Sequence, residues 1–335
     1  MSTLKLAILP GDPAGIGYEI TAKALACPHI AHMTRPHAVI LYAHDALFRR
    51  ACTQFAPALR PHIRHQASDI DAPGIYLVPV MDDVDLARDM RPGVPDAVCA
   101  QCAHQAIIRC AQDARMHLID GMCTGPIHKG AMRLADVPDI GHTEMLARAF
   151  DAANPTTLFI TRALRIFFYS RHLSLRQAID ALDKDHLVAF GRRVYAHLRE
   201  LGFEHPRIAL AALNPHASDG GQFGDEERTI LEPAVAQWRA ENLDILGPIG
   251  ADSVFAQAAK RQFDAVISLY HDQGHIAAKT YDFDRTISAT LGLPILRTSV
   301  DHGTAFDIAW KGTAQSVSMQ TAIETLAELL ANAKK

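Results

Sequence analysis

Short apolar runs of strand length alternate with longer segments of helical periodicity along most of the chain, and this alternation constrains the fold most strongly. Strand-like runs lie at 4–9, 38–42, 74–80, 118–123, 207–213 and 265–269. Helix-like segments lie at 18–26, 45–55, 95–116, 184–201 and 316–332. Such alternation is typical of βαβ units, whose crossover helices join parallel strands. We therefore expect an α/β protein with a largely parallel sheet.

Length and charge narrow the class of protein. A chain of 335 residues has room for two domains, since one domain usually has about 100–200 residues. Lysine and arginine number 33 against 37 acidic residues, so no basic field predicts a nucleic-acid partner. The apolar run before Pro10 is too short for a signal peptide, and no apolar run has the length of a membrane span. A cytoplasmic protein without membrane partners is expected.

The six cysteines are expected to be reduced thiols. Cys99-x-x-Cys102 has the spacing of a zinc or redox motif. With Ala106 and Cys110, however, these cysteines follow helical spacing, and no second pair of ligands accompanies them. Packing inside a helix is the favoured interpretation.

Three histidines each follow an apolar run that reads as a strand. His271 opens the segment His271-Asp272-Gln273-Gly274 after 265–269, His216 follows 207–213, and His172 follows 164–169. Ligands of open α/β sheets bind at the carboxyl ends of strands. Neutral imidazoles are common metal ligands, and three protein ligands with an open position are typical of catalytic sites. The alternative is three unrelated polar loops, because no spacing rule joins these segments.

Two further segments admit a functional and a structural interpretation. The turn from Pro10 to Gly17 is either an anion-binding nest or a tight strand-to-helix turn; it lacks the order of glycines of the dinucleotide fingerprint. In Gly141-His142-Thr143-Glu144, Thr143 is a possible N-cap, and His142 is either a phosphate or carboxylate contact or part of the cap.

Several motifs occur together and in a characteristic order. They are GDPAGIG from residue 11, PIHKGA, GHTE, LNPHASDGGQFGDEE, YHDQG and TLGLPILRTSVDHGTAFDIAWKG ending at residue 312. In these motifs the chain resembles the 4-hydroxythreonine-4-phosphate dehydrogenase family. The resemblance implies the isocitrate and isopropylmalate dehydrogenase fold, with two α/β/α domains and a cleft between them. It implies an NAD-binding domain at 1–125 plus 285–335, and a substrate, metal and dimerisation domain at 126–284.

The resemblance also assigns residues, and it implies a homodimer with a shared active site. The implied ligands of a divalent metal (zinc, magnesium or cobalt) are His172, His216 and His271. The implied substrate contacts are His142, Thr143, Asp252, Lys279, Ser288 and Arg297, with Lys279 or Asp272 as the proton relay. The implied contacts to NAD or NADP are Gly303, Thr304, Ala305, Phe306 and Asp307.

Four positions distinguish this chain from the usual family pattern. Ser288 replaces an asparagine before TLGLP, Tyr18 replaces a proline, and Trp310 replaces a glycine beside the implied cofactor segment. His275, in HDQGHI, resembles catabolic relatives that act on phosphorylated four-carbon sugar acids. This favours 4-phospho-threonate or 4-phospho-erythronate over 4-phosphooxy-threonine.

The expected reaction is oxidation of a secondary alcohol that lies between a carboxylate and a phosphate. A bound metal would act as a Lewis acid on the alcohol, hydride would pass to the nicotinamide, and the β-keto acid would lose carbon dioxide. Another branch of the family oxidises cis-dihydrodiol carboxylates, but the implied phosphate-binding Arg297 argues against it. The remaining alternatives are a phosphate acyltransferase of related fold, which needs no histidine-bound metal, and a non-catalytic metal-binding protein.

Overall fold

The computed structural model describes residues 3–139 and 141–333, and the chain divides into two compact units. Unit 1 extends to Pro155 and continues from Ile287 to Ala331, while unit 2 contains mainly the residues from Thr156 to Thr286. The first boundary therefore lies after Pro155 instead of at 125. The reason is that two helices before Pro155, α6 (Lys129–Leu134) and α7 (His142–Phe150), pack against α5 (Ala97–Arg115) of unit 1.

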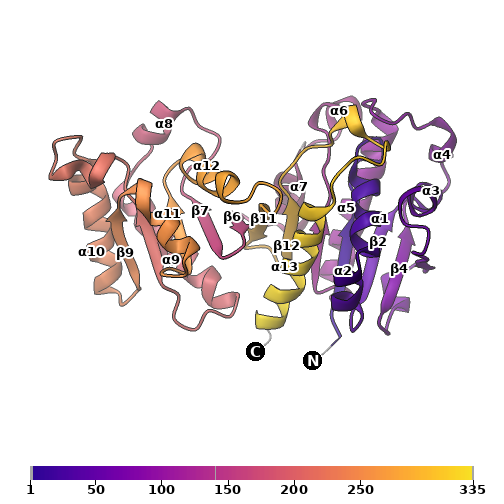
Figure 1. Cartoon of the computed structure of the whole chain (residues 1–335), viewed down its shortest axis with the longest axis horizontal. Helices are drawn as coiled ribbons and strands as arrows, with labels where there is room; N and C mark the ends of the chain where they lie inside the picture. Colours follow the sequence, from indigo (N-terminus) through magenta and orange to yellow (C-terminus); the bar gives the residue numbers. More distant parts are fainter. Residues whose placement is uncertain (1–2, 140, 334–335) are drawn as a thin grey trace. The chain divides into compact units, whose positions relative to one another are not determined.

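The strands of unit 1 form a mostly parallel sheet (Figure 1). Their order is β3 (His62–Ile63), β4 (Gly74–Pro79), β2 (Ala38–Ala43), β1 (Lys5–Leu9), β5 (Gly121–Thr124), β12 (Leu296–Val300) and β11 (Ile287–Leu291). Neighbouring strands pair in parallel except β11 and β12, which are antiparallel. The two central strands β1 and β5 are buried along almost their whole length, which explains their continuous apolar sequences.

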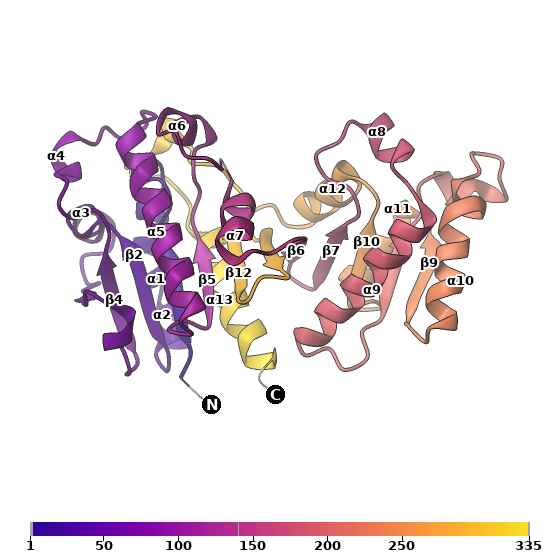
Figure 2. The same cartoon turned by 180° about the vertical axis from the view of Figure 1, so that it is seen from behind.

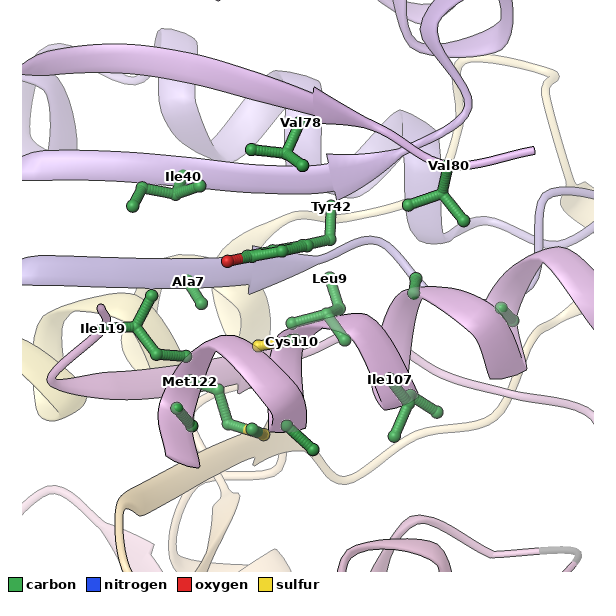
Figure 3. Close-up of a cluster of buried hydrophobic side chains, with 14 of the residues drawn as sticks. Ala7, Leu9, Ile40, Tyr42, Val78, Val80, Ile107, Cys110, Ile119 and Met122 are labelled. Carbon is green, nitrogen blue, oxygen red and sulfur yellow. The ribbon is translucent and has the colours of Figure 1, made fainter. Parts of the chain in front are cut away.

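Helices cover both faces of the unit 1 sheet (Figures 1 and 2). They are α1 (Gly17–Ala26), α2 (Pro28–Thr34), α3 (Asp45–Phe55), α4 (Leu86–Asp89), α5 (Ala97–Arg115), α6 (Lys129–Leu134), α7 (His142–Phe150) and α13 (Val317–Ala333), with short turns η1 (Ala67–Asp69) and η4 (Phe306–Ile308). Figure 3 shows Ile107 and Cys110 of α5 against Leu9 and Tyr42 of the strands. Cys99, Cys102 and Cys110 are buried free thiols on α5, as the helical spacing predicts.

Unit 2 has a second mostly parallel set of strands. Their order is β6 (Thr156–Thr161), β7 (Leu164–Phe168), β10 (Ala265–Ser268), β8 (Ile208–Ala211) and β9 (Ile245–Ile249). Only the hairpin of β6 and β7 is antiparallel. The helices are α8 (Leu175–Asp180), α9 (Lys184–Glu200), α10 (Glu232–Ala240), α11 (Ala251–Ala259) and α12 (His271–Tyr281), with the short 3-10 helix η2 (Pro215–Asp219) and the π-helix η3 (Glu227–Leu231) that leads into α10. Helices α11 and α12 cover one face, and α9 and α10 the other (Figures 1 and 2).

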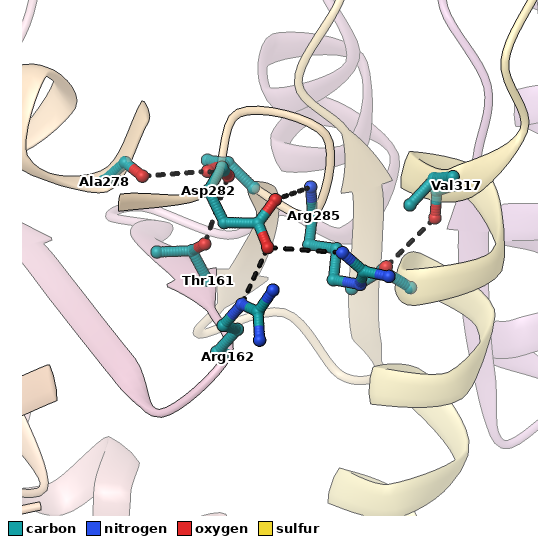
Figure 4. A network of polar contacts seen from close by, with 8 residues as sticks. Thr161, Arg162, Ala278, Asp282, Arg285 and Val317 are labelled. Atoms are coloured by element: carbon teal, nitrogen blue, oxygen red, sulfur yellow. Dashed lines mark hydrogen bonds and ion pairs between the residues drawn. The ribbon is translucent and has the colours of Figure 1, made fainter. Parts of the chain in front are cut away.

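The carboxyl end of α12 is tied to the β6–β7 hairpin through Asp282 (Figure 4). Arg162 in the hairpin turn donates from Nε to the Asp282 carboxylate at 2.7 Å, and Thr161 donates to the Asp282 carbonyl at 3.3 Å. The Arg285 amide donates to the same carboxylate at 3.1 Å. Helix α12 is therefore held at its carboxyl end as well as by its packing on the strands.

The predicted α/β class is confirmed, and most predicted elements begin and end within a few residues of the observed ones. Helix 45–55 agrees at both ends. Strands β9, β11 and β12 were not predicted, since glycine, proline and polar residues interrupt their apolar patterns. Thr143 is not the N-cap of its helix: the N-cap of α7 is Gly141, two residues earlier, because His142 already has helical geometry.

Candidate active site

In unit 2, the three histidines predicted as metal ligands follow the carboxyl ends of three neighbouring strands. Strand β10 lies between β7 and β8 and is parallel to both. His172 follows β7, His271 is the first residue of α12 after β10, and His216 lies in η2 after β8. The strand order therefore brings three segments that are distant in sequence to one edge of the sheet, as expected for a ligand site of an α/β protein.

The rings of His172 and His271 lie near one another, with centroids 6.4 Å apart. His216 does not complete a triad with them: within residues 3–139 and 141–333, no three His, Cys, Asp or Glu side chains are arranged to hold a metal ion. Residues His216 to Asp219 all have positive φ, so the backbone of this loop is left-handed throughout. The donor chemistry and the strand order fit a metal site, while the single chain assembles only two of its predicted ligands.

Buried polar side chains fix these strand ends, and sequence analysis did not identify them. Gln273 donates from Nε2 to the Ala212 carbonyl after β8 at 2.8 Å, and its Oε1 accepts from the Leu269 amide after β10 at 2.8 Å. Ser170, after β7, donates to the Leu269 carbonyl at 2.8 Å. The three strand ends are thus cross-linked by two side chains. The signal for Gln273 was its place inside the YHDQG motif.

A buried carboxylate holds the loop that carries His216. Glu227 of η3 is fully buried, and its Oε1 accepts from the amides of Leu213 and Asn214 at 2.9 and 2.7 Å. Its Oε2 accepts from the Asn214 side-chain amide at 2.8 Å. Glu227 thus satisfies two backbone amides of the preceding loop.

His271 has a defined partner for one ring nitrogen. Its Nδ1 lies 2.5 Å from Oδ1 of Asp272. Since a carboxylate only accepts, Nδ1 donates, and in the neutral ring Nε2 then carries the lone pair, which is the tautomer that a metal ligand requires. Asp272, predicted as a proton relay, therefore also orients His271.

The other unit 2 candidates lie on helices near these strand ends. Lys279 lies two turns after His271 on α12, about 12 Å along the helix axis, with Nζ 5.6 Å from the centroid of the Phe283 ring. Asp252 is exposed in the first turn of α11.

Unit 1 contains a polar patch on one face of three neighbouring strands. Thr290 and Arg297 face each other across β11 and β12, as do Ser288 and Ser299, so all four side chains share one face. Thr124 of β5 is paired in register with Ser299 and donates to its Oγ at 2.9 Å. Ser288, the residue that replaces the family's asparagine, thus belongs to this patch.

Arg297 is buried in the middle of this patch. It donates from Nε to Thr124 Oγ1 at 3.0 Å and from one terminal nitrogen to Thr290 Oγ1 at 2.9 Å. Burial lowers the pKa of Arg297 to about 10, and the negative charge of Glu144 acts in the opposite direction. The side chain is therefore a cation at neutral pH, and it donates hydrogen bonds to the two uncharged hydroxyls of Thr124 and Thr290.

His142, at the start of α7, belongs to the same region. Burial lowers its pKa well below the usual value, and the positive charge of Arg297 lowers it further. Its Nε2 is buried without a hydrogen-bond partner in the described part of the chain. A neutral imidazole beside a cation can donate to or accept from a bound anion, and Thr143 follows it on the helix. The predicted residues His142 and Arg297 are therefore brought together.

The segment predicted to contact the cofactor is joined to the glycine-rich turn. The Ile16 amide donates to the Thr304 carbonyl at 3.0 Å, and a Cβ on Gly15 would lie 2.9 Å from Thr304 Cβ. Ala305 has a left-handed backbone, and Phe306 packs on the ring of His128 at 4.8 Å between centroids. Gly303 and Asp307 are exposed. This geometry leaves the two ends of the segment accessible.

The turn itself uses its amides internally, which favours the structural interpretation over an anion nest. The amide of Ala14 donates to Asp12 Oδ1 at 2.9 Å, and that of Gly15 donates to the Asp12 carbonyl at 3.1 Å. Gly17 is required because a Cβ would lie 1.8 Å from the Pro10 carbonyl oxygen. Asp12 is fully buried, and burial raises its pKa to about 6 while the Ala14 amide lowers it.

Comparison with known proteins identifies the family. The family model described as pyridoxal phosphate biosynthetic protein PdxA matches residues 35–326. The chain belongs to this family. A relative from Symbiobacterium thermophilum with the provisional name D-threonate 4-phosphate dehydrogenase is 44% identical over 330 residues, covering 97% of this chain and 96% of the relative.

Solved structures agree with the PdxA assignment. A 4-hydroxythreonine-4-phosphate dehydrogenase from Klebsiella pneumoniae is 35% identical with a TM-score of 0.86, covering 98% of this chain and 100% of that one. A terephthalate 1,2-cis-dihydrodiol dehydrogenase from Burkholderia xenovorans is 27% identical with a TM-score of 0.67, covering 97% and 98%. This PdxA family member is a dehydrogenase that acts on CH–OH donors. Among the described residues, no helix combines the length and apolarity needed to cross a bilayer.

Proposed function

We propose that the protein uses NAD or NADP to oxidise the secondary alcohol of a 4-phosphorylated hydroxy acid of the D-threonate 4-phosphate type, and that the β-keto acid product loses carbon dioxide. The observation that carries this proposal is the buried Arg297, whose side-chain hydrogen bonds go to two neutral hydroxyls, Thr124 and Thr290. A buried cation of this kind is stabilised by an anionic ligand. Relatives named for a phosphorylated substrate support the same choice.

In unit 1, Arg297 would bind an anionic group of the substrate through its planar guanidinium, and His142 would hydrogen-bond to it through Nε2. The low pKa of His142 keeps this ring neutral, so it can accept a hydrogen bond from the substrate without adding a second positive charge. Ser288 and Thr143 would complete the polar surroundings. The shorter Ser288 side chain leaves more room than asparagine, which suits a different substituent on the substrate.

His172, His216 and His271 would hold a divalent metal ion, for which zinc, magnesium and cobalt are the candidates. Such an ion supplies Lewis acidity that makes the substrate hydroxyl easier to deprotonate near neutral pH. Asp272 would keep His271 in the tautomer that leaves Nε2 available. Because Asp272 is engaged in this way, we assign the relay of the alcohol proton to Lys279 and the binding of a further substrate group to Asp252.

We further propose a homodimer in which the three histidines of one site come from two subunits. This accounts for the incomplete triad of the single chain. Complementation tests it: His172→Ala, His216→Ala and His271→Ala chains are mixed in pairs after reversible dissociation, and activity is measured. At least one pair should regain activity if the site is shared. Recovery in none of the pairs would place the site within one chain.

Gly303 to Asp307 would contact the cofactor, with the exposed Gly303 and Asp307 facing the ligand and Thr304 anchored on Ile16. Because Gly15 packs tightly against Thr304, residues 303–307 can move only together with the glycine-rich turn. The choice between NAD and NADP follows from titrating both cofactors with the same substrate.

The deciding experiment is a panel of D-threonate 4-phosphate, D-erythronate 4-phosphate and 4-phosphooxy-threonine with NAD or NADP and added zinc, magnesium or cobalt. Formation of reduced cofactor and release of carbon dioxide are both followed. A phosphorylated acid should be the best substrate. The second candidate function is oxidation of a cis-dihydrodiol carboxylate, favoured by the likeness to the Burkholderia xenovorans enzyme. Turnover of such a diol alone would replace the proposed substrate and remove the phosphate-binding role of Arg297.

A further inference from the structure

His275 lies one helical turn after His271 on α12 and contacts it in two ways. The two imidazole rings are stacked, with centroids 3.6 Å apart and planes 12° from parallel. His275 Nδ1 also donates to the His271 carbonyl at 2.8 Å. The stacking and the hydrogen bond together fix the His275 ring relative to the first residue of the helix.

His275 is itself held on its other sides by aromatic rings of two strands. The Phe159 ring lies 4.3 Å from it in an edge-to-face arrangement, and the Phe168 ring lies 4.6 Å away. The preceding residue, Gly274, lets the helix approach this closely, since a Cβ there would lie 2.5 Å from a ring carbon of Phe168. The ring of His275 is thus part of the packed surface between α12 and the β6–β7 hairpin.

His271 is different, because its side chain is 41% exposed. An exposed imidazole usually exchanges among rotamers, and a metal ligand that must be ordered on binding loses affinity. Here one face of the ring rests on His275, and Nδ1 is held by Asp272 at 2.5 Å. The face contact restricts the ring plane, and the hydrogen bond restricts rotation within that plane.

We propose that His275 is a positioning residue that preorganises His271 so that Nε2 points into the metal site. The inference rests on the proposed metal-dependent function, and it adds a role for a residue that is not among the three predicted ligands. Phe159 and Phe168 hold the His275 ring in place, and the His275 ring in turn restricts the motion of the exposed His271 ring that stacks on it. The stacked ring, more than the hydrogen bond to the carbonyl, carries this effect, because the helix already fixes the His271 backbone.

Two variants separate stacking from the hydrogen bond. His275→Phe keeps a flat ring against His271 and suits the aromatic surroundings, but it lacks Nδ1. His275→Ala removes both contacts. His197→Ala is the matched control, because His197 is a buried histidine of the same unit whose Nδ1 lies 3.1 Å from Oε2 of Glu200 on its own helix. Circular dichroism and thermal midpoints are used to check that each variant folds like the wild-type protein.

The first measurement is metal affinity of the metal-free protein by competition with a chromogenic chelator, using zinc as the probe. His275→Ala should weaken zinc binding by about 10- to 100-fold, the usual effect of losing an outer-shell support, while His275→Phe and His197→Ala stay near the wild-type affinity. Equal affinity of His275→Ala and wild type would overturn the proposal. So would an equal loss in His275→Ala and His275→Phe, which would assign the effect to the hydrogen bond.

The second measurement does not depend on metal. Nitrogen-15 and carbon-13 NMR of histidine-labelled, metal-free protein reports the tautomer and the side-chain order of His271. The wild type should show a single tautomer with the proton on Nδ1 and restricted ring motion, and His275→Ala should show averaged rotamers. If wild-type protein binds no zinc, the proposed function fails, while restricted His271 motion that disappears in His275→Ala still supports the positioning role. Unchanged order in His275→Ala would reject that role independently.

Discussion

Tyr18 and Trp310 stack on one another in unit 1, with ring centroids 6.3 Å apart and planes 27° from parallel. These are two positions at which the chain departs from its family pattern, and they lie at opposite ends of the sequence. Trp310 also donates from Nε1 to the Pro13 carbonyl at 2.8 Å, and the Arg50 guanidinium lies 4.8 Å from its ring centroid. The two large side chains therefore fill one site together, and Trp310 connects the segment that follows residues 303–307 to the glycine-rich turn.

Trp310→Gly should destabilise the protein, because it empties a buried aromatic site. A loss of about 3–5 kcal/mol is expected for removing such a side chain, reduced by about 1 kcal/mol because glycine relieves the left-handed backbone at φ 61°. Urea unfolding of the single variants and of Tyr18→Ala/Trp310→Gly measures the coupling. The coupling energy should be about 0.5–1.5 kcal/mol. Strict additivity would mean that the two rings act separately.

Arg297→Met should lower kcat/KM for a phosphorylated substrate by about 100-fold or more, since a buried charge-assisted contact is typically worth about 2–5 kcal/mol. Arg297→Lys should recover only part of this, because an ammonium cannot reproduce the two-pronged geometry. Initial rates over a range of substrate concentrations provide the measurement. Arg88→Met, at an exposed ion pair with Asp89, is the control and should leave the rates unchanged. A small effect of Arg297→Met on kcat/KM would show that Arg297 does not contribute to substrate binding.

Asp12 should make the protein less stable as pH rises from about 4 to about 6. Its folded pKa of about 6 lies above the ordinary value of 3.8, so the folded state binds the proton more tightly, and this stabilisation is lost as pH rises through 6. The full effect is roughly 3 kcal/mol. Asp12→Asn should reduce the pH dependence of the unfolding free energy between about pH 4 and pH 6, as measured by urea titrations at several pH values. An unchanged slope in the variant would assign the dependence to other groups.

Asp282 should make the protein less stable as pH falls, which is opposite to the effect of Asp12. Burial alone would raise its pKa, but hydrogen bonds from Arg162 and Arg285 lower it below 3.8. Its stabilisation is therefore complete above the ordinary value and is lost as pH falls through the lower folded pKa. Asp282→Asn should lower the thermal midpoint at pH 7, and the difference from wild type should shrink below pH 4. A constant difference down to pH 2 would show that the hairpin is held by uncharged contacts.

The sequence predicted those features that depend on local pattern. Alternating strand and helix segments predicted the parallel sheet, and parallel order then places His172, His216 and His271 at one edge. Gln273 and Glu227 were missed because their partners are backbone groups 61 and 14 residues away, which no local periodicity reveals. Strands β11 and β12 were missed because the residues that line the polar patch interrupt their apolar pattern.

The discontinuity of unit 1 has a consequence for synthesis. Unit 2 is nearly continuous in sequence, whereas β12 reaches its place beside β5 only after residues 296–300 have been made. Until then, β5 presents an open edge in the nascent chain, and such edges invite pairing with other chains. Unit 2 can complete its folding on the ribosome, while the N-terminal part of unit 1 has to wait until residues 287–331 have been translated.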